Sequence, residues 1–194
     1  MRFLVGLLSL VLCACTLGSD ASSEDDSSTT TSDEEVVLER VESEEETFRV
    51  VQLMDDIEHG WAVDWLPDGR MLITERPGQI LLVDEGTATA LDNVPEVWAE
   101  NQGGMLDVRV APNYQESGWI YMSYSLKAGD TGGTVLARAT LDGTALTNVE
   151  EVYRQTPFLG TNYHFGSRIA FLNDGTLAVS MGERGQRRER TVDI

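Results

Sequence analysis

The sequence of 194 residues has little cysteine, little positive charge and no long apolar run. Its two cysteines are Cys13 and Cys15, so the chain after residue 15 has no disulfide, thiolate metal site or thiol nucleophile. Lysine and arginine number 14 against 33 aspartates and glutamates. No basic stripe is present to meet phosphates, which argues against nucleic acid as a partner. The apolar stretch at residues 3–12 is shorter than the ~20 residues that a membrane-spanning helix needs.

Residues 1–15 have the pattern of an export signal, with Arg2 ahead of the apolar stretch. The signal ends in Leu12-Cys13-Ala14-Cys15, which resembles a bacterial lipobox. Cys15 fits the lipidated position best, because small Ala14 precedes it and Leu12 lies three residues back. An ordinary secretory signal with incidental cysteines is the alternative. We expect a lipoprotein of the bacterial cell envelope, held on the periplasmic side by a membrane anchor, with the outer membrane as the favoured location.

Residues 16–47 are dominated by Ser, Thr, Asp and Glu, and Arg40 is their only base. Such a segment buries too little apolar surface to offset the entropy lost on ordering. We therefore predict a disordered acidic tether between the anchor and a folded domain that begins at residue 48.

Residues 48–194 consist of short apolar runs separated by Gly, Pro, Asn and Asp, with no helical stripe of useful length. Turn signals such as Pro67-Asp68-Gly69 and Asp174-Gly175 separate alternating segments, a pattern typical of an all-β protein built from hairpins. The expected strands are residues 61–66, 71–75, 79–83, 105–110, 119–125, 133–140, 150–154, 168–172 and 176–181.

A strand–turn–strand unit recurs along this region. Residues 63–74 match residues 169–180, with Asp68-Gly69 aligned to Asp174-Gly175, and a weaker copy runs over residues 108–123. Recurring units of this size are typical of propeller blades, which have ~40–50 residues each. A β-sandwich is the alternative, but it does not explain the repeated unit. We predict a partial β-propeller over residues 48–194 with about three blades, the N-terminal part of a longer protein.

A short motif near the C-terminal end carries the strongest chemical signal. His164, one of two histidines, has Gly166 close by, Arg168 four residues on and Glu183 downstream. An imidazole positioned by a carboxylate can act as a general base. The alternative is a buried histidine that is bonded to the main chain. The other histidine, His59, precedes the first expected blade and is interpreted as structural.

Several motifs together resemble a known family. Residues 66–78 (Leu-Pro-Asp-Gly-Arg-Met-Leu-Ile-Thr-Glu-Arg-Pro-Gly), residues 101–108 (Asn-Gln-Gly-Gly-Met-Leu-Asp-Val), residues 164–168 and Gly182-Glu183 are similar to the soluble PQQ-dependent aldose sugar dehydrogenases, the glucose/sorbosone dehydrogenase group. The resemblance implies a six-bladed propeller that carries pyrroloquinoline quinone (PQQ) and calcium. It implies oxidation of an aldose sugar at C1 to a lactone, with electrons passed to an acceptor.

The resemblance also implies roles for individual residues. His164 matches the general base that acts on the sugar C1 hydroxyl, and Glu183 matches an acid that orients this base. Gln102 matches a glutamine near cofactor and sugar, and Gly103 allows the main chain to approach closely. Arg168 either contacts the site or braces it.

Three points leave alternatives open. Tyr163 stands where glucose-oxidising members carry an acid, so the preferred sugar is undetermined. The basic loop at residues 184–190 faces either an anionic quinone or the acidic tether. In the family, the calcium loop and the cationic PQQ contacts come from later blades, so we expect no metal site in this chain and little activity from it alone. A non-catalytic, lipid-anchored binding module is the competing function.

Overall fold

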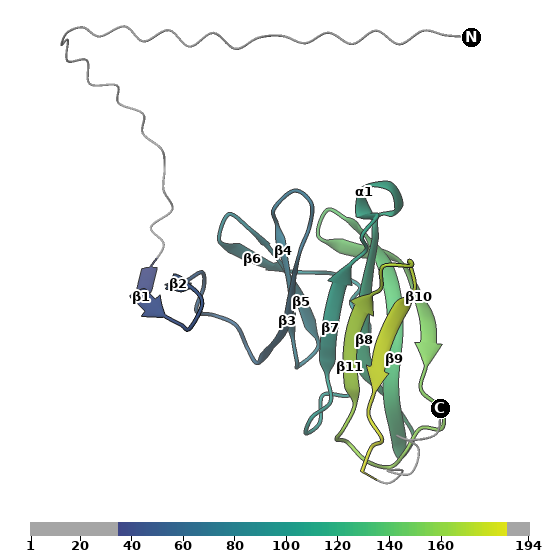
Figure 1. Cartoon of the computed structure of the whole chain (residues 1–194). Helices are drawn as coiled ribbons and strands as arrows, with labels where there is room; N and C mark the ends of the chain where they lie inside the picture. Colours follow the sequence, from purple (N-terminus) through teal and green to yellow (C-terminus); the bar gives the residue numbers. More distant parts are fainter. Residues whose placement is uncertain (1–34, 186–194) are drawn as a thin grey trace, which may run out of the picture. The chain divides into compact units, whose positions relative to one another are not determined.

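Two four-stranded antiparallel sheets make up most of the computed structural model, which describes residues 35–185 (Figure 1). The chain visits the strands of each sheet in spatial order, as in propeller blades. A two-stranded sheet follows them, and a short helix, α1, lies between β7 and β8. The elements are β3 (Gly60–Trp65), β4 (Met71–Glu75), β5 (Gln79–Asp84), β6 (Thr87–Ala90), β7 (Met105–Val110), α1 (Tyr114–Ser117), β8 (Trp119–Ala128), β9 (Thr131–Asp142), β10 (Ala145–Arg154), β11 (Gly166–Phe171) and β12 (Leu177–Met181).

The repeated sequence unit forms the same turn twice. Between β3 and β4 the N–H of Gly69 donates to the carbonyl of Leu66 at 3.0 Å, and Gly69 has φ 94°. Between β11 and β12 the N–H of Gly175 donates to the carbonyl of Leu172 at 3.0 Å, with φ 85° at Gly175. Both glycines have positive φ values that other L-residues rarely adopt. The turn chemistry of the repeat thus sets the hairpin that opens the first sheet and the hairpin of the β11–β12 sheet.

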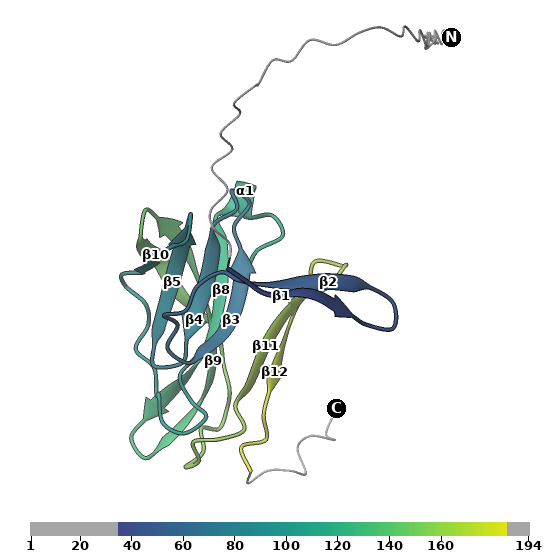
Figure 2. The same cartoon turned by 90° about the vertical axis from the view of Figure 1, so that its left-hand side faces the viewer.

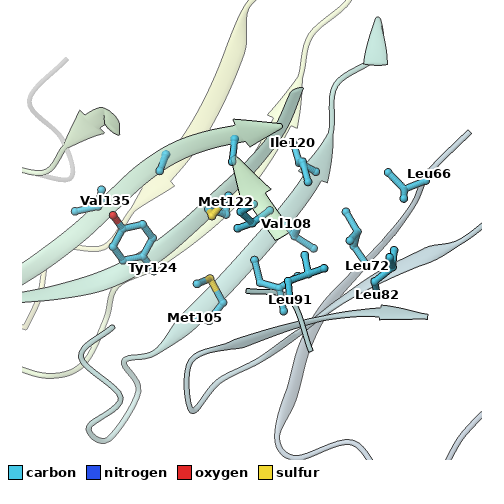
Figure 3. Packing of buried hydrophobic residues seen from close by; sticks show 14 residues of the cluster. Leu66, Leu72, Leu82, Leu91, Met105, Val108, Ile120, Met122, Tyr124 and Val135 are labelled. Carbon is cyan, nitrogen blue, oxygen red and sulfur yellow. The ribbon is translucent and has the colours of Figure 1, made fainter. Parts of the chain in front are cut away.

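The main core lies between the two four-stranded sheets (Figure 3). Leu72 from β4 and Leu82 from β5 pack in one cluster with Val108 from β7 and Met122 from β8. Burial of a side chain of this size contributes about 1.5–3 kcal/mol. The first strands of successive sheets also lie together, since β3 contacts β7 and β7 contacts β11. This packing brings the ends of these strands, and the loops that they carry, to one site.

The folded region starts earlier than expected. Strands β1 (Glu35–Glu42) and β2 (Thr47–Gln52) form a hairpin, which Figure 2 shows as a two-stranded ribbon. The expectation that residues 16–47 have no regular structure is therefore wrong for residues 35–42, which form β1, and for Thr47, which begins β2. The segment carries β-formers such as Val36 and Val41 among its acids, and most of its side chains are exposed. Ladder hydrogen bonds form without a buried face, so acidic composition alone does not exclude the strand.

The remaining predictions about the N-terminal part lie outside the described residues. These are the export signal at 1–15, lipidation of Cys15 and the tether at 16–34. Residues 186–194, which include most of the basic loop, also lie outside. Within residues 35–185, no helix has the length and apolar character needed to cross a membrane.

Candidate active site

The antiparallel pairing of β11 and β12 brings His164 and Glu183 together. Gly166, the first residue of β11, pairs with Met181, the last residue of β12. The residue two positions before β11 and the residue two positions after β12 therefore leave the sheet at the same end. Nδ1 of His164 lies 2.6 Å from Oε1 of Glu183.

The His164–Glu183 contact determines which imidazole nitrogen carries the proton. When ionised, the Glu183 carboxylate only accepts hydrogen bonds, so a neutral imidazole in this contact carries its proton on Nδ1 and keeps a free lone pair on Nε2. The His164 side chain is 46% exposed, whereas that of Glu183 is 16% exposed. The less exposed Glu183 thus orients the imidazole through Nδ1, and Nε2 is available for a proton transfer.

The backbone at His164 is held in an unusual conformation. Its φ is 55°, in the left-handed region, and its N–H donates to Oε1 of Gln102 at 2.8 Å. A Cβ on Gly182 would lie 1.7 Å from the His164 carbonyl oxygen. Only glycine therefore fits at position 182, and the path of the loop around His164 depends on this close approach.

Gln102 belongs to a second loop that is tied to the first. The N–H of Gln102 donates to the carbonyl of Asn162 at 3.2 Å, and the side chains of Asn101 and Asn162 are hydrogen-bonded at 3.2 Å. Nη1 of Arg76 donates to the carbonyls of Asn101 and Gly103. The loop at residues 101–104 is therefore fixed from both sides.

A recess of about 430 Å³ opens between these loops. It combines one positive side chain, two amides, an imidazole and two aromatic faces, which is the mixed polar and apolar lining usual in small-molecule sites. Its lining consists of Trp61, Arg76, Asn101, Gln102, Leu106, His164, Phe165 and Gly166.

Comparison with known proteins identifies the origin of this arrangement. The family model described as "Glucose / Sorbosone dehydrogenase" matches residues 57–194. The chain belongs to the glucose/sorbosone dehydrogenase family. A curated relative, the aldose sugar dehydrogenase YliI of Escherichia coli, is 41% identical over 148 residues, which cover 73% of this chain and 40% of the relative.

Solved structures support the same assignment. A crystal structure of a glucose dehydrogenase has a TM-score of 0.69 at 36% identity, covering 72% of this chain and 42% of that one. The PQQ-bound form of an aldose sugar dehydrogenase from Streptomyces coelicolor has a TM-score of 0.60 at 27% identity, covering 69% of this chain and 41% of that one. The chain spans about two fifths of the length of these relatives. Its all-β fold is therefore part of a propeller of the glucose/sorbosone dehydrogenase type, as the repeat predicts.

Two other residues that were expected at the site, Gly103 and Arg168, do not line the recess. Gly103 is buried, and a Cβ at this position would lie 2.4 Å from the Trp98 carbonyl oxygen, so only glycine fits there. Arg168 stacks over the Trp61 ring at 4.9 Å and donates to Asp107 at 2.9 Å. Gly103 thus shapes the loop under Gln102, and Arg168 braces a wall of the recess through Trp61.

Asp107 is a buried acid that sequence reasoning missed. It lies in the middle of β7 with no exposed surface, and its Oδ2 accepts the N–H of Ile169 at 2.6 Å. Burial raises the pKa of the Asp107 carboxyl above its ordinary value of 3.8, while the Ile169 N–H and the charge of Arg168 lower it. Asp107 links β7 to β11. The only sequence signal for it is a charge inside an apolar strand.

Arg76 and Arg184 were also missed. Arg76 lies just after β4 and lines the recess, whereas Arg184 is 1% exposed behind the His164 loop. From the sequence, Arg184 belonged to a basic loop that faced either an anionic quinone or the acidic tether. In the structure its side chain is buried and donates hydrogen bonds to main-chain carbonyls. Within residues 35–185, no group of three or more His, Cys, Asp or Glu side chains is placed to hold a metal ion.

Proposed function

We propose that this protein oxidises aldose sugars at C1 to lactones, with His164 as the general base. Membership of a sugar dehydrogenase family supports sugar oxidation in general. The observation that carries the specific proposal is the His164–Glu183 pair at the edge of the recess. An imidazole held by a carboxylate, with its second nitrogen available, is the arrangement that general-base catalysis requires.

The protein's own residues would act on the proton of the C1 hydroxyl. Nε2 of His164 would accept this proton, and Glu183 would stabilise the resulting imidazolium through the hydrogen bond at Nδ1. Gln102 would keep the ring in place by holding the His164 main-chain N–H. When bound, PQQ supplies the oxidant that takes up the hydride from C1.

The residues of the recess fit one side of a planar, anionic quinone. Trp61 supplies a partly exposed aromatic ring, and the side chains of Arg76 and Gln102 offer polar groups to carboxylates and carbonyls. Calcium usually takes several carboxylate oxygens, and no group of three or more His, Cys, Asp or Glu side chains among residues 35–185 is placed to supply them. We assign no step to calcium in this part of the protein.

The chain is much shorter than its relatives. Because it spans about two fifths of them, the complete reaction is proposed for the full-length protein that contains this sequence. The 194 residues alone are expected to show little or no activity. An absorbance titration in which they bind PQQ tightly would contradict that expectation.

We also propose that Cys15 is lipidated and that residues 16–34 separate the anchor from the folded part. The support is the lipobox-like sequence and the acidic composition. Such an anchor would hold the protein at the periplasmic side of the bacterial envelope, at the outer membrane, where an electron acceptor would collect the electrons. Radiolabelled palmitate incorporation, lost in Cys15→Ala and kept in Cys13→Ala, would test the anchor.

The catalytic proposal is tested on the full-length protein reconstituted with PQQ and calcium, by following dye reduction with a panel of aldoses. His164→Asn is the informative variant, because asparagine tolerates the positive φ at this position. His59→Asn is its matched control, since His59 also has positive φ and its side chain is 63% exposed.

We expect His164→Asn to lower kcat by about 10²–10⁴-fold and His59→Asn to leave it unchanged. Equal rates for His164→Asn and the parent would refute the general-base role. Sugar binding without dye reduction in any variant would favour the binding-module alternative.

A further inference from the structure

Arg184 is a buried cation to which the proposed reaction assigns no task. It follows Glu183 directly, is 1% exposed and has φ 63°. None of the ion pairs found among residues 35–185 involves it. Burial lowers the pKa of the Arg184 guanidinium from its ordinary value to about 10. Burying a cation without a carboxylate partner is costly, so its hydrogen bonds must offset that cost.

The guanidinium of Arg184 binds three main-chain carbonyls. Nε donates to the carbonyl of Tyr163 at 2.9 Å and Nη1 to that of Gly132 at 2.7 Å, while Nη2 donates to the carbonyl of Thr161. Two of these carbonyls belong to the loop just before His164. The third belongs to β9, in the neighbouring sheet, so the guanidinium ties the loop to a rigid element.

The same group also contacts the residue after His164. The guanidinium carbon lies 3.9 Å from the centre of the Phe165 ring. Arg184 therefore holds the residues on both sides of His164, one through the Tyr163 carbonyl and the other through the Phe165 ring. A planar fork with five N–H donors and a stacking face can make all these contacts at once, whereas a lysine cannot.

The main chain of Arg184 fixes the other half of the pair. Its carbonyl accepts the hydroxyl of Thr161 at 2.7 Å, and the N–H of Gly182 donates to the carbonyl of Phe165 at 2.9 Å. Glu183 lies between these two anchored residues. The side chain of Arg184 thus constrains the residues on both sides of His164, and its main chain constrains the position next to Glu183.

From this geometry we infer that Arg184 is a positioning residue, which holds His164 and Glu183 in the arrangement that keeps the proton on Nδ1, without touching the substrate. The inference rests on the proposed general-base function for its catalytic consequence, but its geometric part can be tested separately.

Imidazole ¹⁵N spectroscopy of the full-length protein provides that separate test, because the nitrogen shifts report which ring nitrogen carries the proton. The His164→Asn and His59→Asn variants assign the two signals. In Arg184→Lys we expect the His164 signal to lose its single Nδ1–H pattern, while the His59 signal stays unchanged. Arg138→Lys is the matched control, since Arg138 also stacks on a ring, that of Trp119 at 4.1 Å, but lies on β9 outside these loops.

Kinetics give the second readout. We expect Arg184→Lys to lower kcat by about 10–100-fold with KM changed by less than about 3-fold, because misplacing a catalytic group by an ångström has effects of this size. Arg138→Lys should match the parent in both constants. An unchanged His164 signal together with an unchanged kcat in Arg184→Lys would overturn the inference.

Two further outcomes are decisive. If Arg184→Lys does not fold, Thr161→Val removes only the hydroxyl bound to the Arg184 carbonyl, and a parent-like His164 signal in that variant overturns the inference. If the reconstituted parent oxidises no aldose, the proposed function fails, while the nitrogen spectra still decide whether Arg184 positions the pair.

Discussion

The side chain of Gln102 accepts the main-chain N–H of His164 at 2.8 Å, across 62 positions of the chain. This bond connects the loop before β7 to the loop before β11 and holds a residue with positive φ. The site therefore depends on contacts between loops from different sheets.

Removal of the Gln102 side chain should free the His164 amide. In Gln102→Ala we expect hydrogen exchange at this amide to accelerate by about 10-fold, because one main-chain hydrogen bond contributes about 0.5–1.5 kcal/mol. Gln102→Glu keeps an acceptor and should retain protection. Gln115→Ala, on α1, should have no effect at His164. Parent-like exchange in Gln102→Ala would show that the bond does not hold the loop.

Glu183→Gln should mix the tautomers of His164. An amide can accept from Nδ1–H or donate to an unprotonated Nδ1, so the ring is no longer restricted to one form. We expect kcat to fall by about 10²-fold or more and the imidazole ¹⁵N signals of His164 to change, with those of His59 as the internal reference. Glu183→Asp keeps the carboxylate and should lose less activity. A single Nδ1–H tautomer in Glu183→Gln would disprove this role.

Gly182→Ala should destabilise the fold by about 1–3 kcal/mol, because the new methyl group overlaps the His164 carbonyl oxygen. Gly160→Ala is the matched control, since its Cβ would meet only the Asp130 carbonyl oxygen, at 3.6 Å. We expect it to change stability by less than about 0.5 kcal/mol. Urea denaturation measures both, and equal stability of the two variants would contradict the close-approach argument.

Asp107 should make stability depend on pH in an unusual direction. Because burial raises its pKa, the folded state binds a proton at pH values where the unfolded carboxyl, near 3.8, does not. Between these two pKa values the native state holds more protons, so lowering the pH favours folding. The stability of the parent minus that of Asp107→Asn should therefore increase as the pH falls from 7 to 4.

Asp174→Asn provides the contrast for this pH experiment. The hydrogen bond from the Thr176 hydroxyl lowers the pKa of Asp174, so its contribution is present above 3.8 and is lost as the pH falls below that value. The parent minus Asp174→Asn difference should not increase as the pH falls from 7, and it should begin to decrease as the pH approaches 4. Urea denaturation across this range checks both, and a constant difference for Asp107→Asn would be the contrary result.

Local pattern accounts for much of the fold. The repeated turns around Gly69 and Gly175 and the apolar runs of β4 and β5 are visible in the sequence, and the structure has them where expected. Strand β6 was not predicted, because its sequence Thr-Ala-Thr-Ala is exposed throughout and contains no large apolar residue. It exists because it pairs with β5, and β1 likewise depends on its pairing with β2.

The sequence by itself determined the strand–turn–strand unit, because alternation and positive-φ glycines act over a few residues. It also marked His164 and Glu183 as a candidate pair, since a short hairpin brings the residues that flank it together. Only the tertiary structure decided that Gln102 holds His164 and that Asp107 and Arg184 are buried charges. Those contacts arise when separate sheets pack, and a charged residue within a short apolar strand does not by itself show which partners the interior will supply.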